Sequence, residues 1–565
     1  MRMLPALTGL LVLSLAAGCA GTGGARPGAR RRGRAPAVTA ERPRLLLRAG
    51  KTPPAISLRD LERVPRDDDF KVMFDRLARC RKASAQAMLY LLSGEKKYAE
   101  AALARMRAWK PPEKIGPFEV YFQLREMALA YDWLHDYPGF DETSRAELRR
   151  KAAPLLERGM KIGDDHIFHN YVWMSNCGAW LWALAISGDD PAAGAAVETL
   201  YARLRDGLIP GMEYLKGAPG ESMWYWALYD FSPALQCFLA ARSALSSDPA
   251  GLGRGRPEWL RRQFENVIAC TRPDMKYVPF GDSKTGPDGG VTHEMAGMIA
   301  AATWLLDSPS GAHLGRWLAA KRGPKRYYGE TGIFYFLYAR SVKTRPAEPP
   351  LAALSGDGNG GHAFARSSWK PDATMIAFRC TDHFGDHNHF DQGSFTVYRD
   401  GELALDPRHY KKVRGPQQAT RGHSTLLVDG AGQRPVRGQH FTRLDEFRAN
   451  LKAGLHLETG DMTRFATVPG WTACTGSFAQ AYPDGALARC VRQLLFVPPG
   501  VLLVVDRLAP GAGAPRGGRA ITWQLMLAAE PKVSGRVASV TNGKSWLRCT
   551  PLLTAAGPAP TSTPG

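Results

Sequence analysis

Histidines and carboxylates are concentrated in one stretch of the sequence, residues 382–410, which reads DHFGDHNHFDQGSFTVYRDGELALDPRHY. Two of these histidines, His387 and His389, are separated by one residue and would share a face of an extended chain. For one ring to bind a metal while the other contacts a substrate, the chain must follow an irregular loop there. A polar turn with solvated histidines is the alternative, but the crowding of the whole segment favours a functional site.

The imidazole and carboxylate groups of this region are ligands that zinc takes in proteins. His389 and Asp406 are the first two candidate ligands, and a later histidine would complete the set. His423, at the opening of the next predicted strand, is the first choice for the third ligand, and His440 is the second choice. The sequence therefore predicts a zinc site with one ligand still open.

Two segments of the first half of the chain place polar groups among aromatic residues. HIFHNYVWMSNCGAW contains His169 and Asn170, and imidazole and amide groups are costly in an apolar wall unless they have partners. GESMWYWALYDF contains Tyr225 and Tyr229, which would share a helix face with Glu221 one turn earlier. Both segments suggest a cleft lining, with helix caps and ordinary core packing as the alternatives.

These residues are positioned by two kinds of element. From about Val72 to Leu306 the apolar spacing is helical, and a unit of helix, short turn and second helix recurs. The recurrences lie at 85–106, at 178–200 and, more loosely, at 296–318. Stacked helical hairpins in a toroid or solenoid are the economical interpretation.

The pattern changes near residue 344. TRPAEPPLAALSGDGNG has the composition of a linker, and alternating β-branched and aromatic runs follow it, with turns at Asp400-Gly401 and Pro499-Gly500. We therefore expect an α+β multidomain chain in which an α/α toroid, an incomplete barrel of helical hairpins, precedes an antiparallel β-sandwich. The expected ranges are 43–345 for the toroid, 346–359 for the linker, 360–554 for the sandwich and 555–565 for a disordered tail.

The first residues predict export. Arg2 precedes an apolar run, Leu4–Ala17, that is too short to span a bilayer, and the run ends in Ala-Ala-Gly-Cys at Cys19, which resembles the bacterial lipobox. Residues 1–19 would be a lipoprotein signal peptide, and residues 20–42 a flexible basic tether. We expect a protein anchored to a bacterial membrane by its lipid, on the periplasmic or outer surface. A plain signal peptide is the alternative and also predicts export.

The net charge limits the classes of binding partner, and the cysteine spacing excludes some cysteine-based motifs. The formal net charge is +21, which favours polyanions such as acidic polysaccharides, anionic lipids or nucleic acids. Export and the absence of a recognised motif argue against nucleic acid. The eight cysteines besides Cys19 are scattered singly with no C-x-x-C pair, which excludes zinc-ribbon and thioredoxin motifs and favours buried thiols.

Together, DHNHFDQGSF, GELALDPRHY and HSTLLVDG resemble the C-terminal domain of the heparinase II/III-like polysaccharide lyases. HNYVW and GESMWYW are similar to the cleft motifs of that family's helical toroid, so the resemblance extends over roughly residues 70–510. It implies a lyase that removes the C5 proton of a uronic acid and expels the 4-linked sugar, which leaves an unsaturated product.

The resemblance also implies roles for individual residues. The implied metal ligands are His389 and Asp406, most readily for zinc, with His423 as the third and a structural role for the ion. The implied cleft residues are Tyr225 as the catalytic tyrosine, His387 as the catalytic histidine, Asn170 with His169 facing the uronate carboxylate, and Glu221 in the same motif. Tyr410 matches a tyrosine that some alginate-cleaving relatives use.

Two other functions fit parts of the pattern. A glycoside hydrolase on an α/α barrel would need two carboxylates across a cleft, for which Glu221 and Asp132 are candidates. A surface polysaccharide-binding protein without catalysis would keep the fold and the charge.

Overall fold

The computed structural model describes residues 37–50, 55–162, 166–246, 255–284, 290–356, 360–385, 387–407, 418–436, 441–452, 457–515 and 518–552. All of these belong to one compact unit, Ala35–Gly565. The predicted signal peptide, the lipobox at Cys19, His440 and Tyr410 lie outside the described residues. No helix in the described ranges is long and apolar enough to span a membrane.

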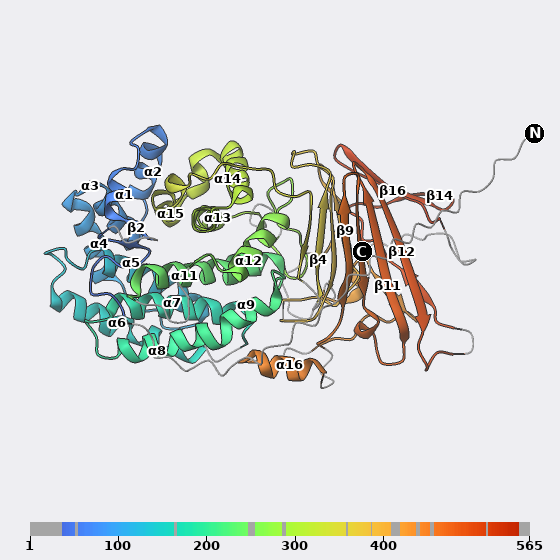
Figure 1. Cartoon of the computed structure of the whole chain (residues 1–565), viewed down its shortest axis with the longest axis horizontal. Helices are drawn as coiled ribbons and strands as arrows, with labels where there is room; N and C mark the ends of the chain where they lie inside the picture. Colours follow the sequence, from blue (N-terminus) through green and yellow to red (C-terminus); the bar gives the residue numbers. More distant parts are fainter. Residues whose placement is uncertain are drawn as a thin grey trace, which may run out of the picture. The chain divides into compact units, whose positions relative to one another are not determined.

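The part of this unit up to residue 351, here called the helical half, is built from helices that gather together in Figure 1. Its α-helices are α1 Leu58–Glu62, α2 Asp68–Ala78, α3 Ala83–Ser93, α4 Lys96–Ala108, α5 Pro117–Trp133, α6 Glu142–Ile162, α7 Asn170–Ile186, α8 Ala193–Arg203, α9 Ile209–Leu215, α10 Met223–Tyr225, α11 Ser232–Ala244, α12 Glu258–Ala269, α13 His293–Leu306, α14 Pro309–Arg322 and α15 Gly332–Leu337. Two short strands, β1 Leu47–Arg48 and β2 Ile56–Ser57, pair in parallel before α1. Two π-helical segments, η1 Leu204–Leu208 and η2 Trp226–Phe231, interrupt the α-helical geometry.

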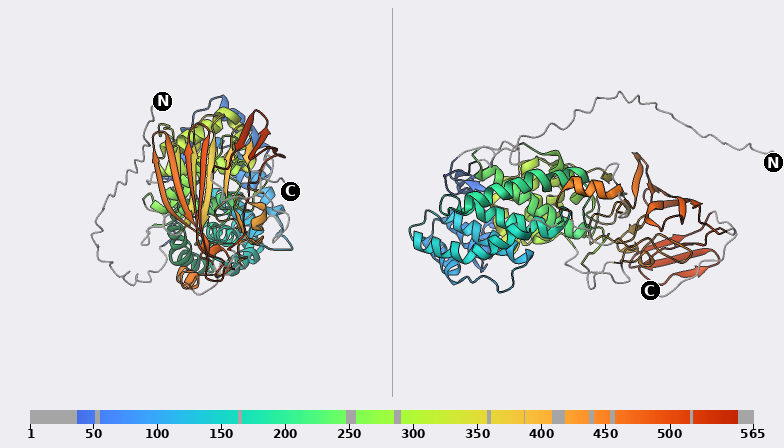
Figure 2. Two further views of the ribbon diagram at one scale, coloured as in Figure 1. Left: turned by 90° about the vertical axis from the view of Figure 1, so that its right-hand side faces the viewer. Right: turned by 90° about the horizontal axis from the view of Figure 1, so that it is seen from below.

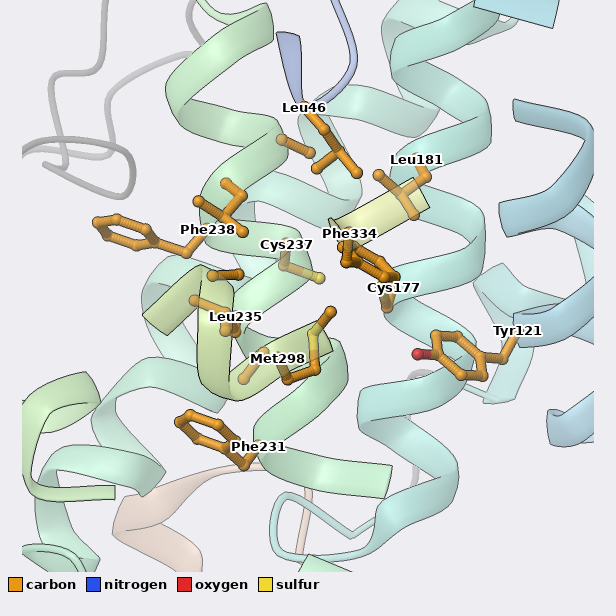
Figure 3. Close-up of a cluster of buried hydrophobic side chains, with 14 of the residues drawn as sticks. Leu46, Tyr121, Cys177, Leu181, Phe231, Leu235, Cys237, Phe238, Met298 and Phe334 are labelled. Carbon is orange, nitrogen blue, oxygen red and sulfur yellow. The ribbon is translucent and has the colours of Figure 1, made fainter. Parts of the chain in front are cut away.

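The three helical hairpins predicted from the sequence are present as α3–α4, α7–α8 and α13–α14. Gly94 ends α3 in the left-handed conformation at φ 72°, which glycine adopts without the steric cost of a Cβ. The core of this half is apolar and closely packed: Figure 3 shows Tyr121 of α5, Cys177 of α7 and Cys237 of α11 turned toward one another's helices. The eight described cysteines are free thiols, and most are buried, as expected.

The remainder of the unit, here called the β half, is built on two main antiparallel sheets. One has the order β3-β4-β5-β6-β7, from β3 Ala352–Ser355, β4 Gly360–Arg366, β5 Met375–Thr381, β6 Phe395–Tyr398 and β7 Glu402–Ala404. The other has the order β12-β11-β10-β9, from β9 Asp461–Val468, β10 Trp471–Ser477, β11 Leu487–Val497 and β12 Val501–Pro510. Buried residues of both sheets, such as Phe378, Cys474 and Phe496, form one core between them.

Smaller elements complete the β half. They are β8 Leu426–Val428 paired with β13 Ile521–Trp523, the three-stranded sheet of β14 Lys532–Ser534, β15 Val537–Asn542 and β16 Ser545–Cys549, and the helix α16 Leu444–Lys452. In Figure 2 α16 lies along the helices of the helical half, and its Phe447 packs against Phe168 and Tyr214 there. The predicted fold class, helical hairpins followed by an antiparallel sandwich, is confirmed.

Two expected boundaries need correction. Strand β3 lies inside the segment predicted as a linker, because its four residues pair with β4 although Pro and Gly dominate their surroundings. The last part of the predicted tether is packed rather than free: the Thr39 N–H donates to Ala244 O at 2.8 Å. The Arg42 side chain, only 6% exposed, pairs there with Asp132 at 3.2 Å and Asp189 at 2.9 Å, which the composition of the tether does not reveal.

Polar contacts join the two halves. Arg272 of the helical half forms an ion pair with Glu402 of β7, and its guanidinium lies 4.8 Å above the ring of Tyr398. Arg366 of β4 donates to the carbonyls of Ala269 and Thr271 at 2.7 and 3.0 Å. Both arginine side chains are buried, and their contacts hold the loops of the two halves against each other beside the site described next.

Candidate active site

The predicted cleft residues come from both halves. His169 is the N-cap of α7, Asn170 begins that helix, Glu221 directly precedes the Ser222 N-cap of α10, and Tyr225 ends α10. Glu221 therefore lies in the loop before the helix, not on the helix face that the spacing predicted. His387 lies in the loop between β5 and β6 of the β half.

The structure brings these five residues together. The ring of Tyr225 stacks on that of His387, with centroids 3.9 Å apart and planes 12° apart. The Asn170 Nδ2 group donates to Glu221 Oε2 at 2.9 Å, and His169 Nε2 lies 3.8 Å from Glu221 Oε1. Ligand atoms of His169, Glu221 and His387 all lie within 4.8 Å of one another.

The orientation of His169 is fixed by its own helix. The backbone N–H of Tyr171 donates to His169 Nδ1 at 3.1 Å, which is the hydrogen bond of an N-cap. A nitrogen that accepts cannot carry the proton, so the proton of the neutral ring lies on Nε2. His169 therefore presents an N–H donor beside Glu221 and His387.

One functional residue was missed in the sequence. Asp282, in the loop between α12 and α13, contacts His387 Nδ1 through Oδ2 at 2.8 Å and His389 Nε2 through Oδ1 at 3.0 Å. These hydrogen bonds outweigh the effect of burial, which favours the neutral acid, and hold the pKa of Asp282 below its usual value. Asp282 stands 105 residues before His387, in a plain FGDS stretch with no spacing signal.

A second carboxyl group lies buried behind Glu221. Asp230 belongs to the π-helical segment η2, is fully buried, and neither of its carboxyl oxygens has a hydrogen-bond partner. Burial and the neighbouring charge of Glu221 raise the pKa of Asp230 well above its usual value. This environment therefore favours the protonated form of the Asp230 carboxyl group.

The three predicted metal ligands also come together. His389 is in the β5–β6 loop, Asp406 follows β7, and His423 follows a 3-10 turn three residues before β8. Their ligand atoms lie within 4.8 Å of one another, and all three side chains are buried. His423 Nδ1 contacts Asp406 Oδ2 at 2.9 Å.

The donor atoms of this group fit a metal ion. His389 Nδ1 and Asp406 Oδ1 are buried and have no hydrogen-bond partner, which is costly for polar atoms unless a further ligand satisfies them. Two imidazoles and one carboxylate are a donor set that zinc takes in proteins. His389, Asp406 and His423 would hold the ion, with Asp282 bonded to the outer nitrogen of His389.

The C-terminal part of the chain has a family match. Residues 352–555 match the family model of the heparinase II/III-like C-terminal domain. No curated protein matches the chain.

Solved structures resemble the chain in fold. A mutant of the heparan sulfate lyase HepC from Pedobacter heparinus is 17% identical, with 85% of this chain and 69% of that chain covered and a TM-score of 0.51. A heparinase III gene product is 15% identical, with 85% of this chain and 71% of that chain covered and a TM-score of 0.52. Residues 352–555 thus match the heparinase II/III-like C-terminal domain, and the chain shares its fold with the heparinase III and heparan sulfate lyase structures.

Proposed function

We propose that this protein is a polysaccharide lyase that cleaves a uronate-containing acidic polysaccharide by β-elimination. The observation that carries the proposal is the stacked pair of Tyr225 and His387, which brings two groups able to transfer protons to one point where the halves meet. The heparan sulfate lyase among the similar structures is named for a polymer of this class. The net charge of +21 suits a polyanionic substrate.

β-Elimination sets three requirements. A base must take the C5 proton, an acid must protonate the leaving O4, and the charge that develops on the uronate carboxylate must be stabilised. The two proton transfers need groups that switch between donor and acceptor, and the third needs fixed donors. The cluster formed by His169, Asn170, Glu221, Tyr225 and His387 offers both kinds of group.

His387 is suited to the base role. Its Nδ1–H donates to the ionised Asp282, so the lone pair of the neutral ring lies on Nε2. Tyr225, with its ring stacked on His387, is the acid that protonates O4. For the other C5 epimer, the proton lies on the opposite face of the sugar, and Tyr225 takes both roles.

The fixed donors come from the start of α7. His169 directs its Nε2–H into the cluster, and Asn170 has a second amide hydrogen besides the one bonded to Glu221. Both can donate to the uronate carboxylate as its charge grows. Glu221 orients this pair rather than reacting.

Aromatic rings extend beside the cluster. Tyr171 contacts His169 with ring centroids 4.5 Å apart, and Phe118 lies 6.0 Å from Tyr171 and 5.3 Å from Tyr229. Such rings provide flat apolar faces with polar edges, which suit the faces of sugar rings. We assign this wall to the sugars next to the cleaved bond.

We further propose that the ion held by His389, Asp406 and His423 is zinc and that its role is structural. When bound, zinc would fix the His389 loop and so the position of His387 two residues earlier. Elemental analysis of purified protein should find stoichiometric zinc, and His423→Ala should lose it. Protein without stoichiometric metal that keeps full activity would contradict this role.

The hydrolase alternative has less support. Asp132, the second carboxylate it would need, is buried and accepts the backbone N–H groups of Arg44 and Leu45, each at 2.8 Å, as well as facing Arg42. Asp132 therefore stabilises the start of the helical half. It does not face Glu221 across a cleft, as a hydrolase requires.

A screen over acidic polysaccharides separates the functions. Elimination gives new ultraviolet absorbance from the unsaturated uronate together with new reducing ends. Hydrolysis gives reducing ends without the absorbance, and binding without either would indicate a non-catalytic protein. Absorbance on at least one uronate polymer supports the proposal, and the other two outcomes contradict it.

For localisation we propose export with a lipid on Cys19. Support comes from the lipobox alone. Metabolic labelling with a fatty-acid analogue in a bacterial host should label the protein and fail with Cys19→Ala. Equal labelling of both proteins would refute the anchor.

A further inference from the structure

We propose that Asp282 is a positioning residue that links the catalytic histidine to the metal site. Its single carboxylate would fix the orientation of both the His387 and the His389 rings. The part of the proposal that concerns catalysis by His387 rests on the lyase mechanism above. The part that concerns metal binding by His389 rests only on the contacts of Asp282.

Each carboxylate oxygen of Asp282 contacts one of the two histidines. Oδ2 contacts His387 Nδ1 at 2.8 Å and Oδ1 contacts His389 Nε2 at 3.0 Å, while only 3% of the residue is exposed. Its backbone N–H also donates to His387 O at 3.0 Å. The loop of the helical half is thus hydrogen-bonded at three points to the segment His387–His389.

The backbone around Asp282 is built for this close approach. Gly281 has φ +73°, and a Cβ on it would lie 2.5 Å from His387 O and 2.7 Å from Ser222 Cβ. The neighbouring Phe280 O accepts the N–H of Met223 at 3.4 Å. The loop around Gly281 is therefore packed between the segment that carries Tyr225 and the segment that carries His387.

The two hydrogen bonds define what each ring offers. An ionised carboxylate only accepts, so His387 must donate from Nδ1 and His389 from Nε2. The lone pairs of the neutral rings then lie on Nε2 of His387 and on Nδ1 of His389. The latter is the buried nitrogen without a hydrogen-bond partner, so a metal ion would bind there.

A carboxylate bonded to a metal-ligating histidine fixes the ring and strengthens the ligand, and losing it typically weakens metal affinity or activity about 10- to 100-fold. Here the same carboxylate also orients the proton-transferring histidine. Disturbing Asp282 should therefore weaken both functions together, although it touches neither substrate nor metal.

Asp282→Asn is the sharpest test because the amide keeps the size of the side chain. Its oxygen can accept from one ring, but its NH2 group cannot accept from the other. We expect zinc affinity, measured by competition with a chromogenic chelator in the absence of polysaccharide, to fall about 10- to 100-fold. With saturating zinc, kcat should fall while KM changes little, and the visible spectrum of the cobalt-substituted protein should shift.

Asp274→Asn is the matched control. Asp274 lies in the same loop, but its carboxylate pairs with Arg272, 3.0 and 2.6 Å away, and contacts neither histidine in the described structure. This variant should lose some stability but keep zinc affinity and kcat. If Asp282→Asn does not fold, Asp282→Glu retains two acceptors and should keep more of the zinc affinity than of kcat.

Wild-type zinc affinity and kcat in Asp282→Asn would overturn the proposal. So would losses equal to those of Asp274→Asn, since these would reflect only the joint between the halves. If the wild-type protein cleaves no polysaccharide, the proposed function fails, but the chelator competition still decides the metal side.

Discussion

The Tyr225 ring of the helical half lies flat on the His387 ring of the β half, with centroids 3.9 Å apart. Neither half holds the pair alone, because α10 positions the tyrosine and the β5–β6 loop positions the histidine. Proton-transferring groups must be held within a fraction of an ångström of the reacting atoms. The contact between the halves is therefore part of the proposed active site.

The first prediction concerns the hydroxyl of this tyrosine. Tyr225→Phe keeps the ring that stacks on His387 but removes the proton donor, so kcat should fall about 10²- to 10⁴-fold. Substrate binding and the unfolding midpoint should change little. Tyr214→Phe, a tyrosine of α9 outside the cluster, should keep the wild-type rate. Unchanged turnover in Tyr225→Phe would remove this residue from the mechanism.

A second prediction uses two glycines with the same backbone conformation. Gly94 and Gly281 have φ of +72° and +73°, so alanine should strain each by about 1–2 kcal/mol. Nothing lies within 4 Å of a Cβ at Gly94, whereas at Gly281 the His387 carbonyl would be 2.5 Å away. Gly94→Ala should lose only stability, and Gly281→Ala should also lose activity. Equal activity in the two variants would show that the loop tolerates displacement.

The packing of α5 on α7 gives a third prediction. A Cβ on Gly178 of α7 would lie 2.5 Å from Val120 O of α5, so Gly178→Ala should destabilise the protein by about 1–3 kcal/mol. Gly194 of α8 faces open space, and Gly194→Ala should stabilise it by about 0.5–1 kcal/mol. Urea unfolding of the two variants checks the signs. A stable Gly178→Ala protein would mean that the helices can move apart at little cost.

Asp230 predicts a pH dependence of stability. Because its pKa is raised in the folded protein, the folded state keeps a proton that the unfolded chain releases above about pH 4. The unfolded state then binds fewer protons, so the free energy of unfolding falls as pH rises, until the pH exceeds the folded pKa. Asp230→Asn removes this contribution, and its urea-unfolding free energy should decline less between about pH 5 and pH 8. Parallel curves for the two proteins would refute the neutral Asp230.

Much of the fold could be predicted because its signals are local. The hairpin α3–α4 shows helical spacing and a glycine stop at Gly94, and β11–β12 shows alternating apolar residues around Pro499-Gly500. Strand β3 could not be predicted, because its four residues lie in a Pro- and Gly-rich segment and become a strand only by pairing with β4. The sequence of these four residues does not indicate that β4 will pair with them.

The candidate site also contains residues that the sequence could reveal and residues that it could not. His387, His389 and Asp406 stand out because titratable residues crowd a short segment. Asp282 does not, because one aspartate in a loop has no pattern, and its role arises only when the fold brings it to two histidines more than a hundred residues away. The packed end of the tether at Arg42 was missed for a similar reason, since Asp132 and Asp189 are distant in sequence.

The most direct test of the account is the mass of the products from a defined uronate oligosaccharide. Elimination adds no water, so the masses of the two fragments should sum to that of the substrate, with the unsaturated fragment lighter than its hydrolytic counterpart by one water. Fragments that together exceed the substrate by one water would show hydrolysis and contradict the lyase mechanism assigned to Tyr225 and His387.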